Sequence, residues 1–303
     1  MKKLDTNFKY DLDAMKLNPN SRDYKKILIR LAQNGDFDTH TTKFKTANQK
    51  KIDGEYVFVP KNLVFRVTRT VVRAIVNLFG PIVTKVAFNL KVIGKANLKG
   101  IKSAVTVSNH VHFLDVLMNM LAFKRKKFYI VGAPHNMKRG IAGYLLKAGG
   151  MLPLSPSISA SKNLKLAISK ILNNGGFVHM YAESALWFRY EKSRPLKIGA
   201  FKMACENNVP VIPLVILFRN KNKLEFFRRK KSITLKICKP IFPDENLPIR
   251  ERAEKMMNEC QNVYNDTICD FYGYDKSTYS IFPSEEELKQ YELNTDTDEK
   301  DEI

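Results

Sequence analysis

The sequence has little cysteine, little tryptophan and a shortage of acidic side chains. It holds four Cys and one Trp in 303 residues, and the Cys residues show no CxxC or Cys/His spacing. Neither a zinc site nor a disulfide framework is indicated, so reduced thiols in a cytosolic setting are expected. Acidic residues number 30 against 51 Lys and Arg, which leaves a formal net charge of +21. Such a surplus favours an anionic partner: nucleic acid, a phospholipid surface or a phosphorylated substrate.

A long uninterrupted apolar run is also missing. The basic N-terminus is not followed by the apolar segment of a secretory signal. In the most apolar region, the longest uncharged window lies between Arg73 and Lys85. It is far shorter than the ~20 apolar residues of a spanning helix, so a classical transmembrane segment is not favoured.

What is present divides the chain into five parts. Residues 1–58 are polar and predict a loosely ordered extension or a small helical appendage. Residues 59–90 predict amphipathic helices, and 91–245 alternate between strand-like and helix-like patterns. Residues 246–283 predict a C-terminal helical segment, and the acidic residues 284–303 predict a mobile tail.

The amphipathic part carries a polar stripe at helical spacing. Its members recur at steps of four, three, four and four: Asn62, Arg66, Arg69, Arg73 and Asn77. Apolar residues fill the other positions, and Gly80-Pro81 predicts a break before a second short helix. A wide apolar face with an Arg stripe suits a helix that lies in a bilayer interface. The alternative is a helix packed on its own domain with its Arg residues facing water.

The alternating part predicts an α/β fold. Short β-like runs lie at 90–94, 103–108, 127–133, 150–154, 176–183, 210–218 and 232–237. Helix-like stretches lie at 114–123, 138–148, 159–173 and 199–207, and a further one at 247–271. Strands alternating with helices predict a mixed, largely parallel sheet flanked by helices.

The stretch VTVSNHVHFLDVL, residues 105–117, contains the main candidate for chemistry. On one helix, His110 and Asp115 would point about 140° apart, so their contact requires a strand, a turn and then a helix. We expect the helix to start near His112 or Phe113. Asp115 would then fix the tautomer of the His110 imidazole and raise its basicity. The alternatives are a helix cap at Ser108 or Asn109, with Asp115 satisfied at the helix start, and His112 as the base.

No protein nucleophile accompanies this pair. The sequence contains no G-x-S-x-G, and no Cys lies in an electropositive turn. A base without a nucleophile predicts direct attack on an electrophile by a bound hydroxyl or by water.

These residues resemble a known family. Ser108-Asn109-His110 followed by Asp115 is similar to the first signature of the glycerolipid acyltransferases, specifically the 1-acylglycerol-3-phosphate acyltransferase family. Three further blocks follow in the family's order: Gly149-Gly150-Met151-Leu152-Pro153-Leu154, Glu183 in MYAESALW, and Val209-Pro210-Val211-Ile212-Pro213. The resemblance covers about residues 60–245, and it is to a divergent bacterial branch.

The resemblance implies a glycerol-3-phosphate acyltransferase-like α/β domain, held by N-terminal helices at the cytoplasmic face of the cell membrane. His110, held by Asp115, would deprotonate the free hydroxyl of a lysophospholipid, most specifically 1-acylglycerol-3-phosphate. The oxygen would attack the thioester of acyl-CoA or acyl-carrier protein, which are co-substrates. No metal or redox cofactor is expected, and no nucleic-acid partner.

The third block departs from the family's F-P-E-G-T-R, because only its Glu183 is kept and Tyr181 replaces the Phe. The missing Arg is the residue that the family uses on the acceptor's phosphate, and Leu186 stands in its place. We expect Glu183 and nearby cations to bind the acceptor instead: Arg189, Lys192, Arg194 and Lys197. Gly149-Gly150 is expected either to bind substrate at the oxyanion or to form a plain helix cap.

Three other functions are compatible with these patterns. A phospholipid-binding pseudoenzyme would explain the altered third block. A non-catalytic module that binds anionic surfaces or nucleic acid would explain the charge, although the basic residues are spread and no aromatic-basic RNA-binding motif appears. Hydrolysis of acyl thioesters by water would use the same base.

Overall fold

The computed structural model describes residues 9–42, 47–124, 126–219 and 232–293. A seven-stranded sheet runs through the chain in the order β1-β7-β6-β2-β5-β3-β4. Its strands are β1 (Lys91–Ile93), β2 (Ala104–Ser108), β3 (Lys127–Gly132), β4 (Met151–Pro153), β5 (Gly176–Met180), β6 (Val211–Arg219) and β7 (Ser232–Ile237). Neighbouring strands are parallel except β6 and β7. The mixed, largely parallel sheet is confirmed, with a strand at each expected run.

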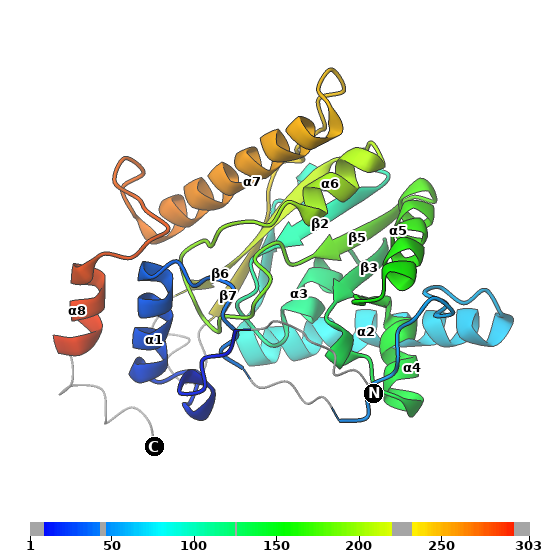
Figure 1. The fold of residues 1–303 in the computed structure, drawn as a ribbon, viewed down its shortest axis with the longest axis horizontal. Helices are drawn as coiled ribbons and strands as arrows, with labels where there is room; N and C mark the ends of the chain where they lie inside the picture. Colours follow the sequence, from blue (N-terminus) through cyan, green and yellow to red (C-terminus); the bar gives the residue numbers. More distant parts are fainter. Residues whose placement is uncertain (1–8, 43–46, 125, 220–231, 294–303) are drawn as a thin grey trace.

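Helices occupy the predicted stretches between the strands (Figure 1). They are α3 (Asp115–Ala122), α4 (Gly140–Gly149), α5 (Ile158–Asn173), α6 (Gly199–Glu206) and α7 (Ile249–Tyr272). The N-terminal part forms α1 (Arg22–Gln33) and α2 (Leu63–Phe88), and the C-terminal part forms α8 (Glu285–Leu293). Short 3₁₀ turns lie at Ala14–Lys16, Lys95–Leu98 and Pro134–Asn136.

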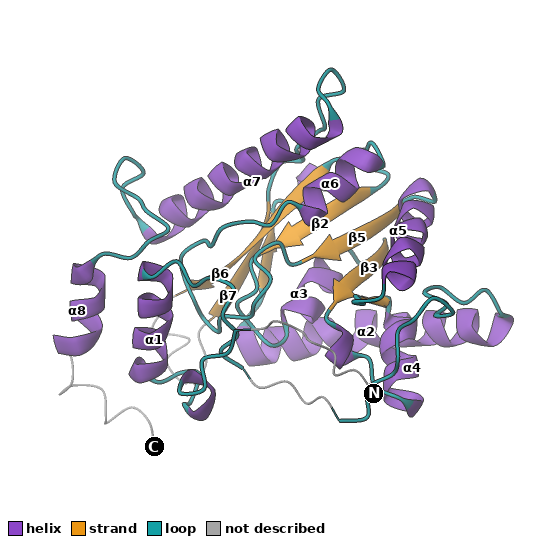
Figure 2. Cartoon of the chain, in the orientation of Figure 1, coloured by secondary structure: helices purple, strands orange, loops and turns teal. Residues whose placement is uncertain are grey.

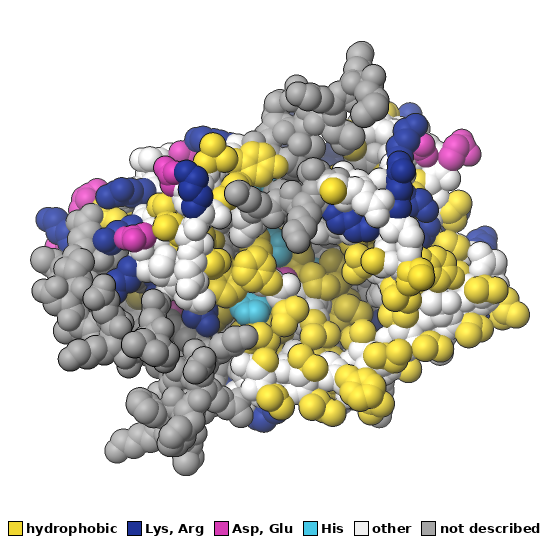
Figure 3. Space-filling model, turned by 90° about the horizontal axis from the view of Figure 1, so that it is seen from below, with side chains coloured by type: hydrophobic (Ala, Val, Ile, Leu, Met, Phe, Trp, Pro, Cys, Tyr) yellow, Lys and Arg dark blue, Asp and Glu magenta, His cyan; other side chains and the backbone are white. Residues whose placement is uncertain are grey.

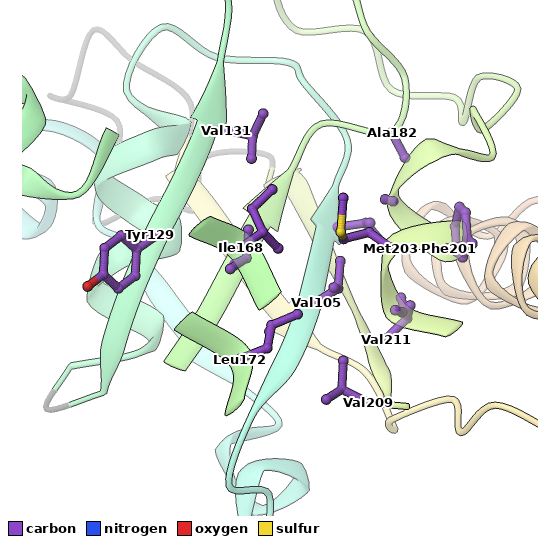
Figure 4. Packing of buried hydrophobic residues seen from close by; sticks show 14 of the residues in the cluster. Val105, Tyr129, Val131, Ile168, Leu172, Ala182, Phe201, Met203, Val209 and Val211 are labelled. Atoms are coloured by element: carbon purple, nitrogen blue, oxygen red, sulfur yellow. The ribbon is translucent and has the colours of Figure 1, made fainter. Parts of the chain in front are cut away.

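The sheet is covered on both faces (Figure 2). One face packs under α5, α6 and α7, where Val105 and Val131 meet α5 at Ile168 (Figure 4). The other face packs on α3 and the end of α2. Because both faces are buried from solvent, the central strands are apolar at nearly every position. Each large side chain buried there contributes about 1.5–3 kcal/mol to folding. All four Cys are buried thiols.

α2 is one continuous helix of 26 residues, so the predicted break at Gly80-Pro81 is wrong. Its N-cap is Asn62, whose side chain accepts a hydrogen bond from the Phe65 N–H. Pro81 costs one backbone hydrogen bond, but the helix continues through it. At Gly80 an added Cβ would lie 3.1 Å from Leu121 of α3. Contact with α3 and α4 along its length therefore outweighs the local helix-breaking signal.

Two of the three Arg residues in the α2 stripe, Arg69 and Arg73, face the protein, whereas Arg66 is exposed. Arg69 lies over the Tyr129 ring at 4.0 Å, and Arg73 donates hydrogen bonds to the Lys126 and Phe128 carbonyls. The exposed side of α2 is apolar, as the yellow side chains of Figure 3 show. It carries Leu63, Val64, Val67, Val71, Ile75, Leu78, Phe79, Ile82, Val83 and Val86. The alternative in which the Arg residues face water is therefore wrong for Arg69 and Arg73 and holds only for Arg66.

The N-terminal part is packed rather than loose. α1 and the turn at 14–16 form a hydrophobic cluster with Trp187, whose indole N–H donates to the Thr39 carbonyl. The predicted acidic tail begins with a helix, α8, which lies beside α1 (Figure 1). Glu287 of α8 forms an ion pair with Lys192, which lies in the loop between β5 and α6. The remainder of both predicted segments, residues 1–8, 43–46 and 294–303, lies outside the described residues.

Candidate active site

The candidate pair lies on a strand, a turn and a helix, as the spacing required. β2 ends at Ser108 between β5 and β6, and α3 begins at Asp115, slightly later than expected. The Asn109 side chain donates to the Ile216 carbonyl at 2.9 Å and accepts from its N–H at 2.8 Å. It therefore extends the pairing of β2 with β6 and fixes the turn. The N-cap of α3 is Leu114, without a side-chain hydrogen bond, so neither Ser108 nor Asn109 caps this helix.

His110 and Asp115 are in direct contact. The His110 Nδ1 and the Asp115 Oδ2 are 2.6 Å apart. Asp115 is fully buried, whereas the His110 side chain keeps 21% of its surface exposed. With Nδ1–H donating to the carboxylate, Nε2 is left as the acceptor, and no described residue hydrogen-bonds to it. The pair thus presents one basic nitrogen toward the open side.

His112 does not share the carboxylate. Its Nδ1 accepts a hydrogen bond from the Leu114 N–H at 3.0 Å. Its ring packs edge-on against Phe88 of α2 at 4.7 Å. The geometry therefore favours His110 over His112 as the base.

Tyr181 holds the other carboxylate oxygen, a role that the sequence analysis did not assign. Its hydroxyl donates to the Asp115 Oδ1 at 2.7 Å, and its ring stacks on His110 at 3.9 Å. Burial, together with the Asp115 charge and this hydrogen bond, raises the pKa of Tyr181 well above its usual value. The hydroxyl therefore remains a donor. The sequence did contain one indication of this role: Tyr181, which has a hydroxyl, replaces the Phe of the family's third block.

His179, in β5, packs against the Tyr181 ring. It is fully buried, and its ring meets the Tyr181 ring edge-on at 4.7 Å. The Asn119 amide donates to Nε2 at 3.1 Å, so the proton lies on Nδ1, which donates to the Thr106 hydroxyl. Burial lowers the pKa of His179 to about 3 and keeps the ring neutral. The sequence analysis did not single out this residue either.

Glu183 and Arg194 form a buried ion pair behind His110. The Arg194 Nη2 lies 2.8 Å from the Glu183 Oε2, and both side chains are almost fully buried. The same Glu183 oxygen accepts from the His110 N–H at 3.2 Å, and Arg194 donates to the His110 carbonyl at 3.3 Å. The expectation that these two residues bind the acceptor is contradicted by their burial. They position the backbone of His110 instead.

Of the other predicted cations, two are engaged elsewhere. Lys197 pairs with Asp38 at 2.6 Å, and Lys192 pairs with Glu287 at 2.7 Å. Arg189 lies in the loop beside the site, where its N–H donates to the Val111 carbonyl at 2.8 Å. Its guanidinium lies 5.4 Å from the Phe188 ring, and its Nε has no described hydrogen-bond partner. Of the four predicted cations, Arg189 is the one that forms no ion pair with a carboxylate in the described part of the chain.

Gly149 and Gly150 lie away from the pair. Gly150 has φ +110° and ends α4 before β4. β4 is separated from β2 by β5 and β3, so three strand spacings, about 14 Å, lie between them. These glycines form the plain helix cap, and the expected contact with the substrate oxyanion is contradicted.

The turn that carries His110 lies beside the apolar surface of α2. In this turn, Phe113 and Leu114 are 54% and 38% exposed. Phe113 stacks on Phe188, and α2 lies against α3. In Figure 3, His side chains are visible in the middle of this face next to hydrophobic ones.

One comparison with known proteins, the match to a family model, agrees with the motifs. Residues 89–217 match the family model described as Acyltransferase. A crystal structure of the 1-acyl-sn-glycerophosphate (LPA) acyltransferase PlsC from Thermotoga maritima is similar to 64% of this chain and 81% of its own, at 16% identity and a TM-score of 0.44. No curated protein matches the chain significantly.

Proposed function

We propose that the protein, whose residues 89–217 match the family model described as Acyltransferase, is a glycerolipid acyltransferase that transfers an acyl chain from a thioester to the free hydroxyl of a lysophospholipid. The observation that carries this proposal is the contact between His110 and Asp115. It leaves the His110 Nε2 without a hydrogen-bond partner among the described residues, on a turn that also exposes Phe113 and Leu114, where a lipid hydroxyl and an acyl thioester can meet.

In this mechanism, the His110 Nε2 takes the proton of the lysophospholipid hydroxyl. The hydroxyl oxygen attacks the thioester carbonyl, and the Asp115 carboxylate stabilises the imidazolium that forms. The tetrahedral intermediate collapses with cleavage of the carbon–sulfur bond, and the imidazolium returns its proton to the departing thiolate. The N–H groups in the first turn of α3, next to His110, are the candidate donors to the oxyanion.

We assign the acceptor's phosphate to Arg189. The three other predicted cations are held by carboxylates, at Lys192, Arg194 and Lys197. An Arg binds phosphate in a bidentate manner, which fits 1-acylglycerol-3-phosphate as the acceptor. Arg189→Gln should therefore raise KM for this acceptor by about tenfold or more, at ~1.5 kcal/mol for a charge-assisted hydrogen bond. Lys197→Gln, which removes an exposed cation, serves as the matched control and should leave KM unchanged.

The proposed location is a membrane surface, reached through α2. The exposed face of α2 is apolar, and only 17% of its most apolar window is buried within the structure. By length and composition, α2 is the one helix among the described residues that could cross a membrane. Because Arg69 and Arg73 fix one side of α2 to the sheet, we propose instead that it lies in the interface, at the cytoplasmic face of the cell membrane.

Purified protein with labelled acyl-CoA or acyl-carrier protein and a panel of lysophospholipids tests the reaction. Acyl transfer should be lost in His110→Ala and in Asp115→Asn, and retained in His112→Ala. Full transfer by His110→Ala would refute the mechanism. Free fatty acid without acylated lipid would identify a thioester hydrolase, and lipid binding without either product would identify a pseudoenzyme.

A further inference from the structure

A basic cleft lies between α2 and the start of β3, away from the catalytic pair. One part of it has a volume of about 460 Å³ and the adjoining part about 250 Å³. Both parts share Arg69 and Lys127. The cleft is lined by Val59, Pro60, Lys61, Phe65, Arg66, Arg69, Thr70, Arg73, Asn77, Lys126, Lys127 and Tyr129.

The cleft concentrates positive charge without a balancing acid. Six of its lining residues are Lys or Arg, and its lining contains no Asp or Glu. None of the six forms an ion pair with a carboxylate in the described part of the chain. The Arg69 Nη2 is buried and has no hydrogen-bond partner among the described residues. Like charges held close together repel one another, so an anionic ligand bound between these cations would relieve that repulsion.

This cleft is separate from the site at His110. Arg69 precedes Phe88, which touches His112, by 19 positions on α2, or about 28 Å at 1.5 Å per residue. The sheet gives the same separation by another route. Lys127 lies at the beginning of β3, whereas His110 follows the end of the parallel strand β2. One ligand head group therefore cannot contact both places.

We propose that the cleft binds the phosphate of an anionic phospholipid of the membrane surface. The cleft lies on the flank of α2, within a helix diameter of its apolar face, and this is the level at which lipid head groups meet an interfacial helix. Phe65, Val59 and Pro60 offer apolar contact to the glycerol and the first acyl carbons. The proposal rests on the interfacial position of α2 in the proposed function. Lipid held there would orient the domain so that His110 faces the membrane.

Titration calorimetry with dihexanoyl phosphatidylglycerol, kept below its micelle concentration, tests the site. The full chain should bind this soluble lipid saturably and should not bind dihexanoyl phosphatidylcholine. Lys61→Gln/Lys127→Gln should weaken binding at least about tenfold, since contacts to charged groups are lost. Both side chains belong to exposed residues, so the fold is kept. Arg69→Gln/Arg73→Gln should weaken binding further.

Two control variants separate the cleft from other surfaces. Lys85→Gln/Lys91→Gln removes the same charge near the other end of α2 and should change the affinity by less than about twofold, since it removes no contact in the cleft. Arg189→Gln should leave it unchanged, because Arg189 belongs to the catalytic side. Equal loss in either control, or no loss in the cleft variants, would overturn the proposal.

A second titration, with inorganic phosphate and with CoA, identifies the source of the phosphate. Weak binding of both supports a membrane lipid. Tight CoA binding that disappears in Lys61→Gln/Lys127→Gln would assign the cleft to a soluble ligand and overturn the membrane assignment. None of these measurements uses catalysis, so failure of the proposed acyl transfer would be recognised separately in the transfer assay.

Discussion

The apolar face of α2 allows the sharpest test of membrane docking. Leu78 and Ile82 lie one turn apart on this face and are 64% and 58% exposed. Full burial of such a side chain is worth about 1.5–3 kcal/mol, so burying the exposed fraction in lipid gives about 1–2 kcal/mol each. Leu78→Gln/Ile82→Gln should therefore cost about 3 kcal/mol of binding, or roughly a 150-fold lower partition coefficient.

Flotation with uncharged phosphatidylcholine vesicles measures this partition without an electrostatic contribution. Gln keeps the helix propensity close to that of Leu, and both positions face outward. The free energy of unfolding in urea should change by less than about 0.5 kcal/mol. Phe242→Gln/Ile249→Gln replaces two exposed apolar residues elsewhere and is the matched control, with an unchanged partition expected. A decrease below threefold in the α2 variant would refute the docking of this face.

Three further predictions concern the buried groups of the site. Tyr181→Phe removes one of two donors to Asp115, so kcat should fall about tenfold with KM unchanged; an unaltered kcat would contradict its positioning role. Arg194→Met leaves the buried Glu183 carboxylate without its counter-charge and should destabilise the fold by about 3–5 kcal/mol in urea unfolding, whereas Arg194→Met with Glu183→Gln should recover part of this loss. Because the pKa of His179 is lowered to about 3, the unfolded state binds more protons at this residue below the usual pKa of 6.5, and the residue contributes a loss of about 2 kcal/mol of stability by pH 5. The pKa values of His40 and His135 are also lowered, to about 4, so His179→Gln should remove only its own share and make the pH dependence shallower by about 2 kcal/mol. Equal pH dependence of the two proteins would show that His179 does not contribute.

Much of the fold was predictable because local patterning and tertiary structure agree. The alternation of apolar runs with helical patterns placed the sheet strands and the helices α3 to α7 at the expected stretches. At α2 the local sequence and the tertiary structure disagree. Gly80-Pro81 predicts the end of a helix, yet packing against α3 keeps α2 continuous. The N-terminal part appeared polar and loose, because its cluster with Trp187 depends on contacts far apart in the sequence.

The candidate site shows the same division. The spacing of His110 and Asp115 required a strand, a turn and a helix, and the structure places the two side chains in contact. The roles expected of Glu183 and Arg194 were wrong, because a motif gives the residue type but not whether folding leaves its side chain open to a ligand. Tyr181 was overlooked since its contact with Asp115 spans 66 positions.

By itself, the sequence determined the α/β alternation, the match of residues 89–217 to the Acyltransferase family model and the pairing of His110 with Asp115. These are short-range properties: periodicity, turn chemistry and a five-residue spacing. Only the tertiary structure decided which side of α2 faces outward and which of the nearby cations remains for a substrate. The physical reason is that a stripe of Arg is compatible with either water or a neighbouring sheet. The choice is made when the Lys126 carbonyl just before β3 and the Phe128 carbonyl within β3 accept hydrogen bonds from Arg73, which leaves the apolar side of α2 exposed.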